Sequence, residues 1–85
     1  MPTIFVLRGV RFMIYPNDHD PPHVHAWGAD YEVVVLLGNC EEIYPTLREV
    51  RGKPSQAALR MILLAAHERC PQLFEAWRIH HGYQG

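Results

Sequence analysis

The residue types best suited to chemistry gather in one short stretch, residues 17–25, which reads Asn-Asp-His-Asp-Pro-Pro-His-Val-His. Three of the six histidines of the chain fall inside it, together with two aspartates and a diproline. Imidazole and carboxylate groups held in one small volume are what metal binding and acid/base catalysis require. The stretch therefore indicates a functional site, although it does not name a reaction.

A divalent metal ion is the first interpretation of this stretch. His23 and His25 are two residues apart, so on a strand their side chains point the same way, with Cα atoms ~6.5 Å apart. His19 or Asp18 would supply a third ligand, and Glu32 would be a further ligand or would orient an imidazole. Zinc, nickel or manganese is the ion expected at such a site.

The same groups also suit acid/base catalysis without a metal. A histidine oriented by Glu32, with a second histidine nearby, can act as general base and general acid in phosphodiester cleavage. Arg11 could stabilise a developing charge, and Trp27 or Tyr15 could stack a base. This interpretation makes the chain a small nuclease or another hydrolase.

Two further interpretations involve no catalysis. Aspartate, asparagine and proline form self-bonded turns, and a histidine Nδ1–H can bind a nearby carbonyl, so the stretch could simply shape a loop. Alternatively, the face that carries the histidines is a docking surface for a small partner protein or for a second copy of the chain. Its exposed side chains would be Trp27, Tyr15, Met13, Val34 and Leu36.

A strand-like first half must position these residues. The clearest strands, rich in β-branched and aromatic residues, are predicted at residues 3–7, 10–15, 23–27 and 31–37. An Arg-Gly pair between the first two predicts a hairpin. A ragged edge strand is expected after residue 40, so that all strands lie within residues 3–51.

The turn after Trp27 decides which side chains share a face with the histidines. A two-residue loop, Gly28-Ala29, would place Glu32 directly opposite His25. A three-residue loop would move Glu32 to the apolar face, so the buried pattern favours the two-residue loop. The histidine face then comprises His23, His25, Trp27 and Glu32, and the core face comprises Val24, Ala26, Val33 and Val35.

A helical second half, residues 55–81, should cover the more apolar face. One apolar stripe repeats at helical spacing through Leu59, Leu63, Ala66, Cys70, Leu73 and Trp77. Ser55 is the expected N-cap. Pro71 interrupts the pattern without changing its phase, which predicts either a kinked helix or two helices with Pro71 in the first turn of the second.

These elements predict one α+β domain over residues 1–85, an antiparallel meander of four to five strands covered on one face by a kinked C-terminal helix or two helices. Hydrophobic residues make up 48% and charged residues 20% of the 85 residues, as in a soluble globular protein. No apolar run approaches the ~20 residues of a membrane span, and no signal peptide is recognisable. A cytoplasmic location without a membrane partner is therefore expected.

Charge and cysteine content also restrict the function. The formal net charge is −1, so nucleic-acid binding is not favoured by charge. Cys40 and Cys70 are too few for a disulfide scaffold and too far apart for a zinc ribbon, and both are expected to be reduced.

The histidines of the helical half have simpler explanations. His67 is expected to pack beside the apolar stripe of the helix, and His80-His81 to complement the dipole at the C-terminus of the helix.

The chain resembles a small prokaryotic family known as domain of unknown function 4160. The segments that carry the resemblance are Met1-Pro2-Thr3, the run from Asn17 to Ala26, Gly28-Ala29-Asp30-Tyr31-Glu32, Ala58-Leu59-Arg60 and Glu75-Ala76-Trp77. Residues 40–46 look like extra chain, and Pro71 interrupts a helix that is usually continuous. Family members are often encoded beside another small uncharacterised domain, which implies a two-gene, toxin–antitoxin-like pair.

The leading hypothesis is a small cytoplasmic binding module, the partner-protein component of such a pair, whose histidine-rich surface also binds a divalent metal. The alternative is a small nuclease or other hydrolase that uses His23, His25 and Glu32. The sequence leaves open whether the chain is an enzyme.

Overall fold

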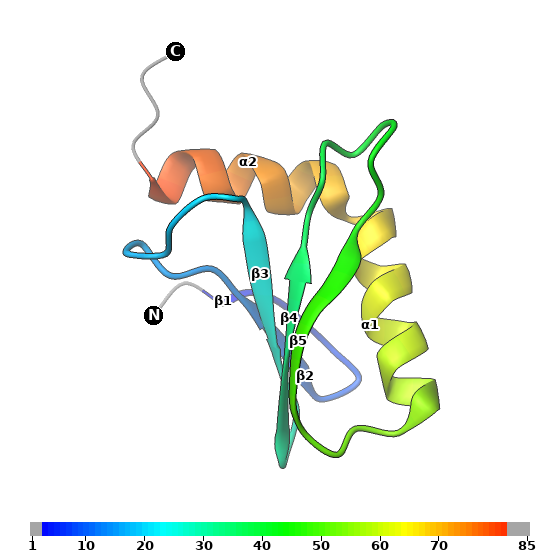
Figure 1. Ribbon diagram of the computed structural model, residues 1–85. Helices are drawn as coiled ribbons and strands as arrows, with labels where there is room; N and C mark the ends of the chain where they lie inside the picture. The colour runs from blue at the N-terminus through cyan, green and yellow to red at the C-terminus, as the bar shows by residue number, and fades with distance from the viewer. Residues whose placement is uncertain (1–2, 82–85) are drawn as a thin grey trace.

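The computed structural model describes residues 3–81, which form a five-stranded sheet followed by two helices. In chain order the elements are β1 (Thr3–Leu7), β2 (Val10–Met13), β3 (His23–Trp27), β4 (Tyr31–Leu36), β5 (Thr46–Gly52), α1 (Gln56–Glu68) and α2 (Cys70–His80). Each strand pairs antiparallel with the next, in the order β1-β2-β3-β4-β5. The predicted α+β meander is confirmed (Figure 1).

The apolar core lies between one face of the sheet and the two helices. The central strands contribute alternate side chains, including Phe12, Val24 and Val35, none of which is exposed. The buried helical residues are Ile62, Ala65, Ala66, Cys70, Leu73 and Trp77. α2 crosses the end of the sheet where β3 begins and β4 ends (Figure 1). Its Trp77 contacts the ring of His23, the first residue of β3.

Pro71 divides the helical region into two helices. Ser55 caps α1 as predicted, because its Oγ accepts the N–H of Ala58 at 3.0 Å. Pro71 lies in the first turn of α2, where a backbone N–H would have no partner within the helix. The two-helix alternative is therefore the correct one. Within residues 3–81, neither helix is long and apolar enough to cross a membrane.

The pairing of β3 with β4 differs from the predicted register by two residues. The observed pairs include His23–Leu36, His25–Val34 and Trp27–Glu32. The loop has two residues, as predicted, but it is Ala29-Asp30 and not Gly28-Ala29, because the Gly28 N–H donates to the Tyr31 carbonyl at 3.0 Å. The ring of Tyr31 lies over Gly28, in the space that a Cβ would fill. Strand side chains alternate with a period of two, so this shift leaves every one of them on its predicted face.

The two cysteines form a disulfide, so the expectation that both are reduced is wrong. Cys40 lies in the loop between β4 and β5, and Cys70 begins α2; their Cα atoms are 5.6 Å apart, a separation that a disulfide spans. The segment that looked like extra chain thus folds back onto the junction of the helices. Cysteine content no longer favours a reducing compartment, and the cytoplasmic location stays a prediction.

The disulfide should stabilise the fold measurably. It joins residues 30 positions apart, and a loop of that length corresponds to about 3.6 kcal/mol in the chain-entropy description. We expect Cys40→Ser to lower the melting temperature by roughly 20 °C in a thermal melt followed by circular dichroism. Dithiothreitol should destabilise the wild type equally and leave Cys40→Ser unchanged. A wild type that melts identically with and without reductant would contradict this prediction.

Candidate functional site

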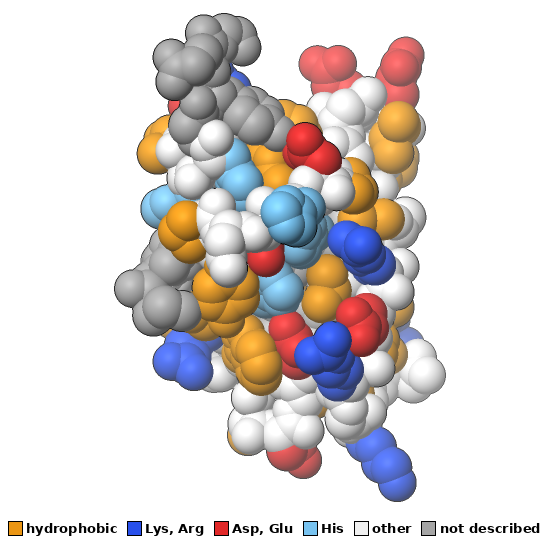
Figure 2. All heavy atoms as spheres, turned by 60° about the vertical axis from the view of Figure 1, so that its left-hand side comes forward, with side chains coloured by type: hydrophobic (Ala, Val, Ile, Leu, Met, Phe, Trp, Pro, Cys, Tyr) orange, Lys and Arg blue, Asp and Glu red, His pale blue; other side chains and the backbone are white. Residues whose placement is uncertain are grey.

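The histidines of β3 lie on the sheet face opposite the helical core. His23, His25 and Trp27 point to this face, and Glu32 joins them from β4, as the sequence predicted. Figure 2 shows histidine side chains in the middle of the face, with hydrophobic, acidic and basic side chains around them. His23 and Glu32 are each only 6% exposed, so this is a partly buried polar cluster and not a solvated surface.

Asp18 reaches the cluster through a tight turn. Pro16 and Asn17 are the central residues of this turn, in which the Asp18 N–H donates to the Tyr15 carbonyl at 3.1 Å. Proline suits the second position of a β-turn because its φ is already fixed. The Tyr15 N–H donates in return to Asp18 Oδ2 at 3.3 Å. The turn therefore directs the carboxylate towards β3.

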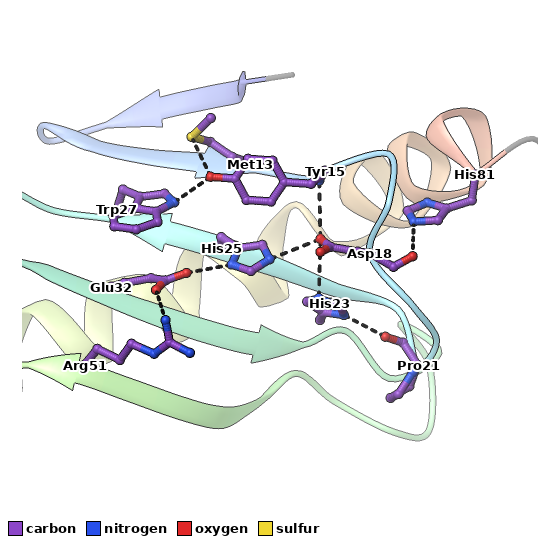
Figure 3. Close-up of polar contacts among 10 residues, drawn as sticks. All are labelled: Met13, Tyr15, Asp18, Pro21, His23, His25, Trp27, Glu32, Arg51 and His81. Atoms are coloured by element: carbon purple, nitrogen blue, oxygen red, sulfur yellow. Dashed lines mark hydrogen bonds and ion pairs between the residues drawn. The ribbon is translucent and has the colours of Figure 1, made fainter. Parts of the chain in front are cut away.

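Hydrogen bonds fix which nitrogen each histidine turns towards Asp18. His23 Nδ1 lies 2.8 Å from the Pro21 carbonyl oxygen, which can only accept, so Nδ1 carries the proton. His25 Nδ1 lies 2.7 Å from Glu32 Oε2 and donates to that carboxylate. Both rings therefore direct Nε2 at Asp18 (Figure 3). Histidines that bind metals have their other nitrogen held in the same way, by a carbonyl or a carboxylate.

Three potential metal ligands converge in this cluster. Asp18 Oδ2 lies 3.1 Å from His25 Nε2 and 3.4 Å from His23 Nε2, and the three atoms lie within 4.8 Å of one another. With both Nδ1 atoms protonated, these three atoms present lone pairs to one another. An extra proton on His25 Nε2 satisfies one of the contacts, whereas a bound cation satisfies all three.

Glu32 connects His25 to an arginine of β5. Its Oε2 accepts from His25, and its Oε1 lies 3.4 Å from a guanidinium nitrogen of Arg51. Arg51 also donates from Nε to Glu49 at 2.9 Å. Glu49 first, and then Glu32, raise the pKa of Arg51 above its ordinary value. Because Glu32 pairs opposite Trp27, it reaches His25 diagonally across the strands and holds that ring in orientation.

The structure brings together some of the predicted site residues and separates others. Asp18, and not His19, completes the set of potential ligands, since His19 is exposed and lies outside the group. Arg11 lies on the same face, opposite Trp27 in the pairing of β2 with β3. It therefore borders the cluster without entering it.

The predicted partner surface is less exposed than expected. Met13 and Val34 are 5% and 6% exposed, so the expectation that both are exposed is wrong. Trp27 Nε1 donates to the Tyr15 hydroxyl at 3.0 Å, and that hydroxyl lies 3.9 Å from Met13 Sδ, so the two aromatic side chains cover the methionine. Tyr15 and Trp27 are themselves half-buried, and their role in partner binding stays a prediction.

His81 belongs to the site, although its predicted position at the end of the helix suggested only a contact with the helix dipole. Its Nδ1 lies 2.8 Å from the Trp77 carbonyl oxygen and its Nε2 lies 2.9 Å from the Asp18 carbonyl oxygen. The His81 ring stacks on Trp77 at 3.8 Å between centroids, and Trp77 contacts the His23 ring at 5.1 Å. The end of α2 therefore holds the Asp18 turn against the start of β3. Arg51 is the other residue that sequence reasoning missed.

The fold and the cluster define a class of protein, a small α+β domain with a histidine–carboxylate site on the sheet face away from its helices. The chain belongs to the family described as Domain of unknown function (DUF4160), whose model matches residues 9–78, or 70 of the 85 residues. The resemblance noted in the sequence is thus confirmed, and the matched segment contains Asp18, His23, His25 and Glu32. No curated protein and no solved structure matches the chain.

Replacing Glu32 should destabilise the fold. We expect Glu32→Ala to lower the free energy of unfolding by ~2 kcal/mol, because the half-buried His25 Nδ1–H loses its acceptor. The matched control is Glu49→Ala, which removes the other carboxylate on Arg51 from an exposed position and should change stability by less than ~0.5 kcal/mol. Urea unfolding followed by circular dichroism measures both. Equal effects of the two variants would show that the bond to His25 contributes nothing.

Proposed function

We propose that this chain is a small binding module centred on a divalent metal ion, held by Asp18 Oδ2, His23 Nε2 and His25 Nε2. The observation that carries the proposal is the convergence of these three lone-pair atoms within 4.8 Å of one another. The Nδ1 bonds to Pro21 and Glu32 support it, since they hold both rings with Nε2 turned towards Asp18, as in histidines that bind metals.

Two of the three separations between the ligand atoms suit a zinc ion. Zinc bonds to histidine nitrogen and carboxylate oxygen are 2.0–2.2 Å long, so neighbouring ligands of a tetrahedral ion lie about 3.3 Å apart. The separations from Asp18 Oδ2 to the two nitrogens, 3.1 and 3.4 Å, are close to this value. Two imidazoles and one carboxylate are also an acceptable set for nickel or manganese, which we rank after zinc.

Three protein ligands leave one tetrahedral position for a ligand from outside the chain. The side chains of Asp18 and His25 are 17% and 14% exposed, so this position can be reached from solvent. In a toxin–antitoxin-like pair, the partner protein would supply the fourth ligand. In the hydrolase alternative, the fourth ligand would be a water molecule activated by the ion.

Metal analysis of the purified chain tests the proposal. We expect close to one equivalent of zinc per chain by isothermal titration calorimetry, and loss of that binding in His25→Ala and Asp18→Asn. Saturating zinc, at 100 times its dissociation constant, should stabilise the wild type by about 2.7 kcal/mol and raise its melting temperature correspondingly.

The matched control is His19→Ala, which removes an exposed histidine from the same loop. It should bind zinc like the wild type. Circular dichroism of each variant distinguishes a lost ligand from a lost fold. A wild type that binds no zinc, nickel or manganese would contradict the proposal. Equal binding of zinc by His25→Ala and His19→Ala would also contradict it.

A further inference from the structure

The outer strand β5 leaves one edge of the sheet without a partner strand among residues 3–81. It ends the strand order, and each of its seven residues is exposed (Figure 1). An edge strand presents backbone N–H and C=O groups to which another strand can pair. Arg48 is an extra residue in the pairing with β4, a bulge, whereas residues 49–52 pair regularly. A further strand can therefore be added along residues 49–52.

Val50 directs its backbone groups out of the sheet. The backbone groups of successive strand residues turn alternately to the two sides. The Tyr31 carbonyl accepts from the Gly28 N–H, so Tyr31 turns towards β3 and the next residue, Glu32, turns towards β5. Arg51 pairs with Glu32 and therefore turns back towards β4. Its neighbour Val50 consequently points its N–H and its carbonyl away from the sheet, where a second strand can reach them.

The side chains around Val50 differ between the two faces of the sheet. Glu49 and Arg51 lie on the histidine face, and their side chains are 47% and 67% exposed. Val50 lies on the core face, paired with the buried Val33, yet it is 41% exposed because it lies at the edge. Leu47 is exposed as well. The edge thus presents apolar side chains on one face and two opposite charges on the other.

This pattern is complementary to itself in one register. Residues that point outwards must face one another, so an antiparallel pair of two copies is centred on a residue. A centre at Glu49 or at Arg51 would oppose two like charges. A centre at Gly52 would set Arg51 opposite Lys53. A centre at Val50 sets Glu49 of each copy directly opposite Arg51 of the other, and sets valine against valine.

The core face provides apolar surface for the same contact. A two-fold axis perpendicular to the sheet leaves the core faces of both copies on one side, so α1 of each copy lies on the same side of the junction. A hollow of about 600 Å³ lies between α1 and the two residues that precede β5. Its walls are Tyr44, Pro45, Arg60, Leu63, Leu64 and His67. Leu64 is 56% exposed, and uncovered apolar surface of this kind indicates a protein partner.

We propose that the partner of β5 is a second copy of this chain, paired antiparallel about Val50 so that the two sheets become continuous. The histidine faces of both copies then lie on one side, and the assembly presents the cluster of Asp18, His23 and His25 twice. The pairing involves none of the proposed metal ligands, so it does not rest on the proposed metal site.

Sedimentation equilibrium of the purified chain, with a chelator present, tests the proposal. We expect a reversible equilibrium between monomer and dimer. Val50→Asp should weaken the dimer at least tenfold, because two carboxylates would face each other at its centre. The matched control is Val6→Asp, which changes an exposed valine of the other edge strand, β1, and should dimerise like the wild type. A wild type that stays monomeric up to ~1 mM, or equal dissociation constants of the two variants, would overturn the inference.

Charge reversal tests the register. Glu49→Arg and Arg51→Glu should each weaken self-association at least tenfold, because like charges then face each other. An equimolar mixture of these two variants should form a heterodimer about as tightly as the wild type dimerises, since opposite charges face each other again. Circular dichroism checks that each variant is folded. Undiminished dimerisation of Glu49→Arg would overturn the pairing about Val50, as would a mixture of the folded variants that stays monomeric.

Discussion

The alternation of side chains along β3 is the constraint on which the rest of the structure depends. β3 is the middle strand of the sheet, and its Val24 and Ala26 are completely buried under the helices. A slip of one residue would drive His23 and His25 into that apolar core, where their polar groups would lack partners, at a cost of several kcal/mol. The core thus determines that both imidazoles emerge on the opposite face. The geometry of the site is a consequence of hydrophobic burial on the other side of the strand.

Asp18 is positioned by different forces, because no strand carries it. The turn that begins at Tyr15 aims its carboxylate, and His81 holds its carbonyl from the end of α2, 63 residues away. Trp77 connects the histidines of β3 with the Asp18 turn, since it is buried in the core and contacts both His23 and His81. The site therefore forms only when the C-terminal helix is in place, and folding of that helix and assembly of the cluster are energetically coupled.

Periodicity made the strand faces and the helical stripe predictable, because both follow from local spacing in the sequence. The position of the turn after Trp27 was not predictable in this way, since it depends on Tyr31 folding over Gly28. The two-residue loop lies one residue later than predicted, which shifts the pairing by two residues and leaves the faces correct. The roles of Arg51 and His81 depend on contacts between distant segments, which no local pattern encodes. The disulfide was missed for the same reason: residue counts do not show that the loop carrying Cys40 returns to α2.

A purely structural role for the histidine stretch explains only half of the observed geometry. The bond from His23 to the Pro21 carbonyl is what a loop-shaping histidine makes, and it would suffice for that purpose. His25 contacts carboxylates through both of its nitrogens, and a loop has no need of such an arrangement. Proline and the Asp18 turn also restrict the loop before any ligand binds, so less binding free energy is lost in ordering it. A preformed group of ligands beside a rigid loop is the arrangement expected of a metal site.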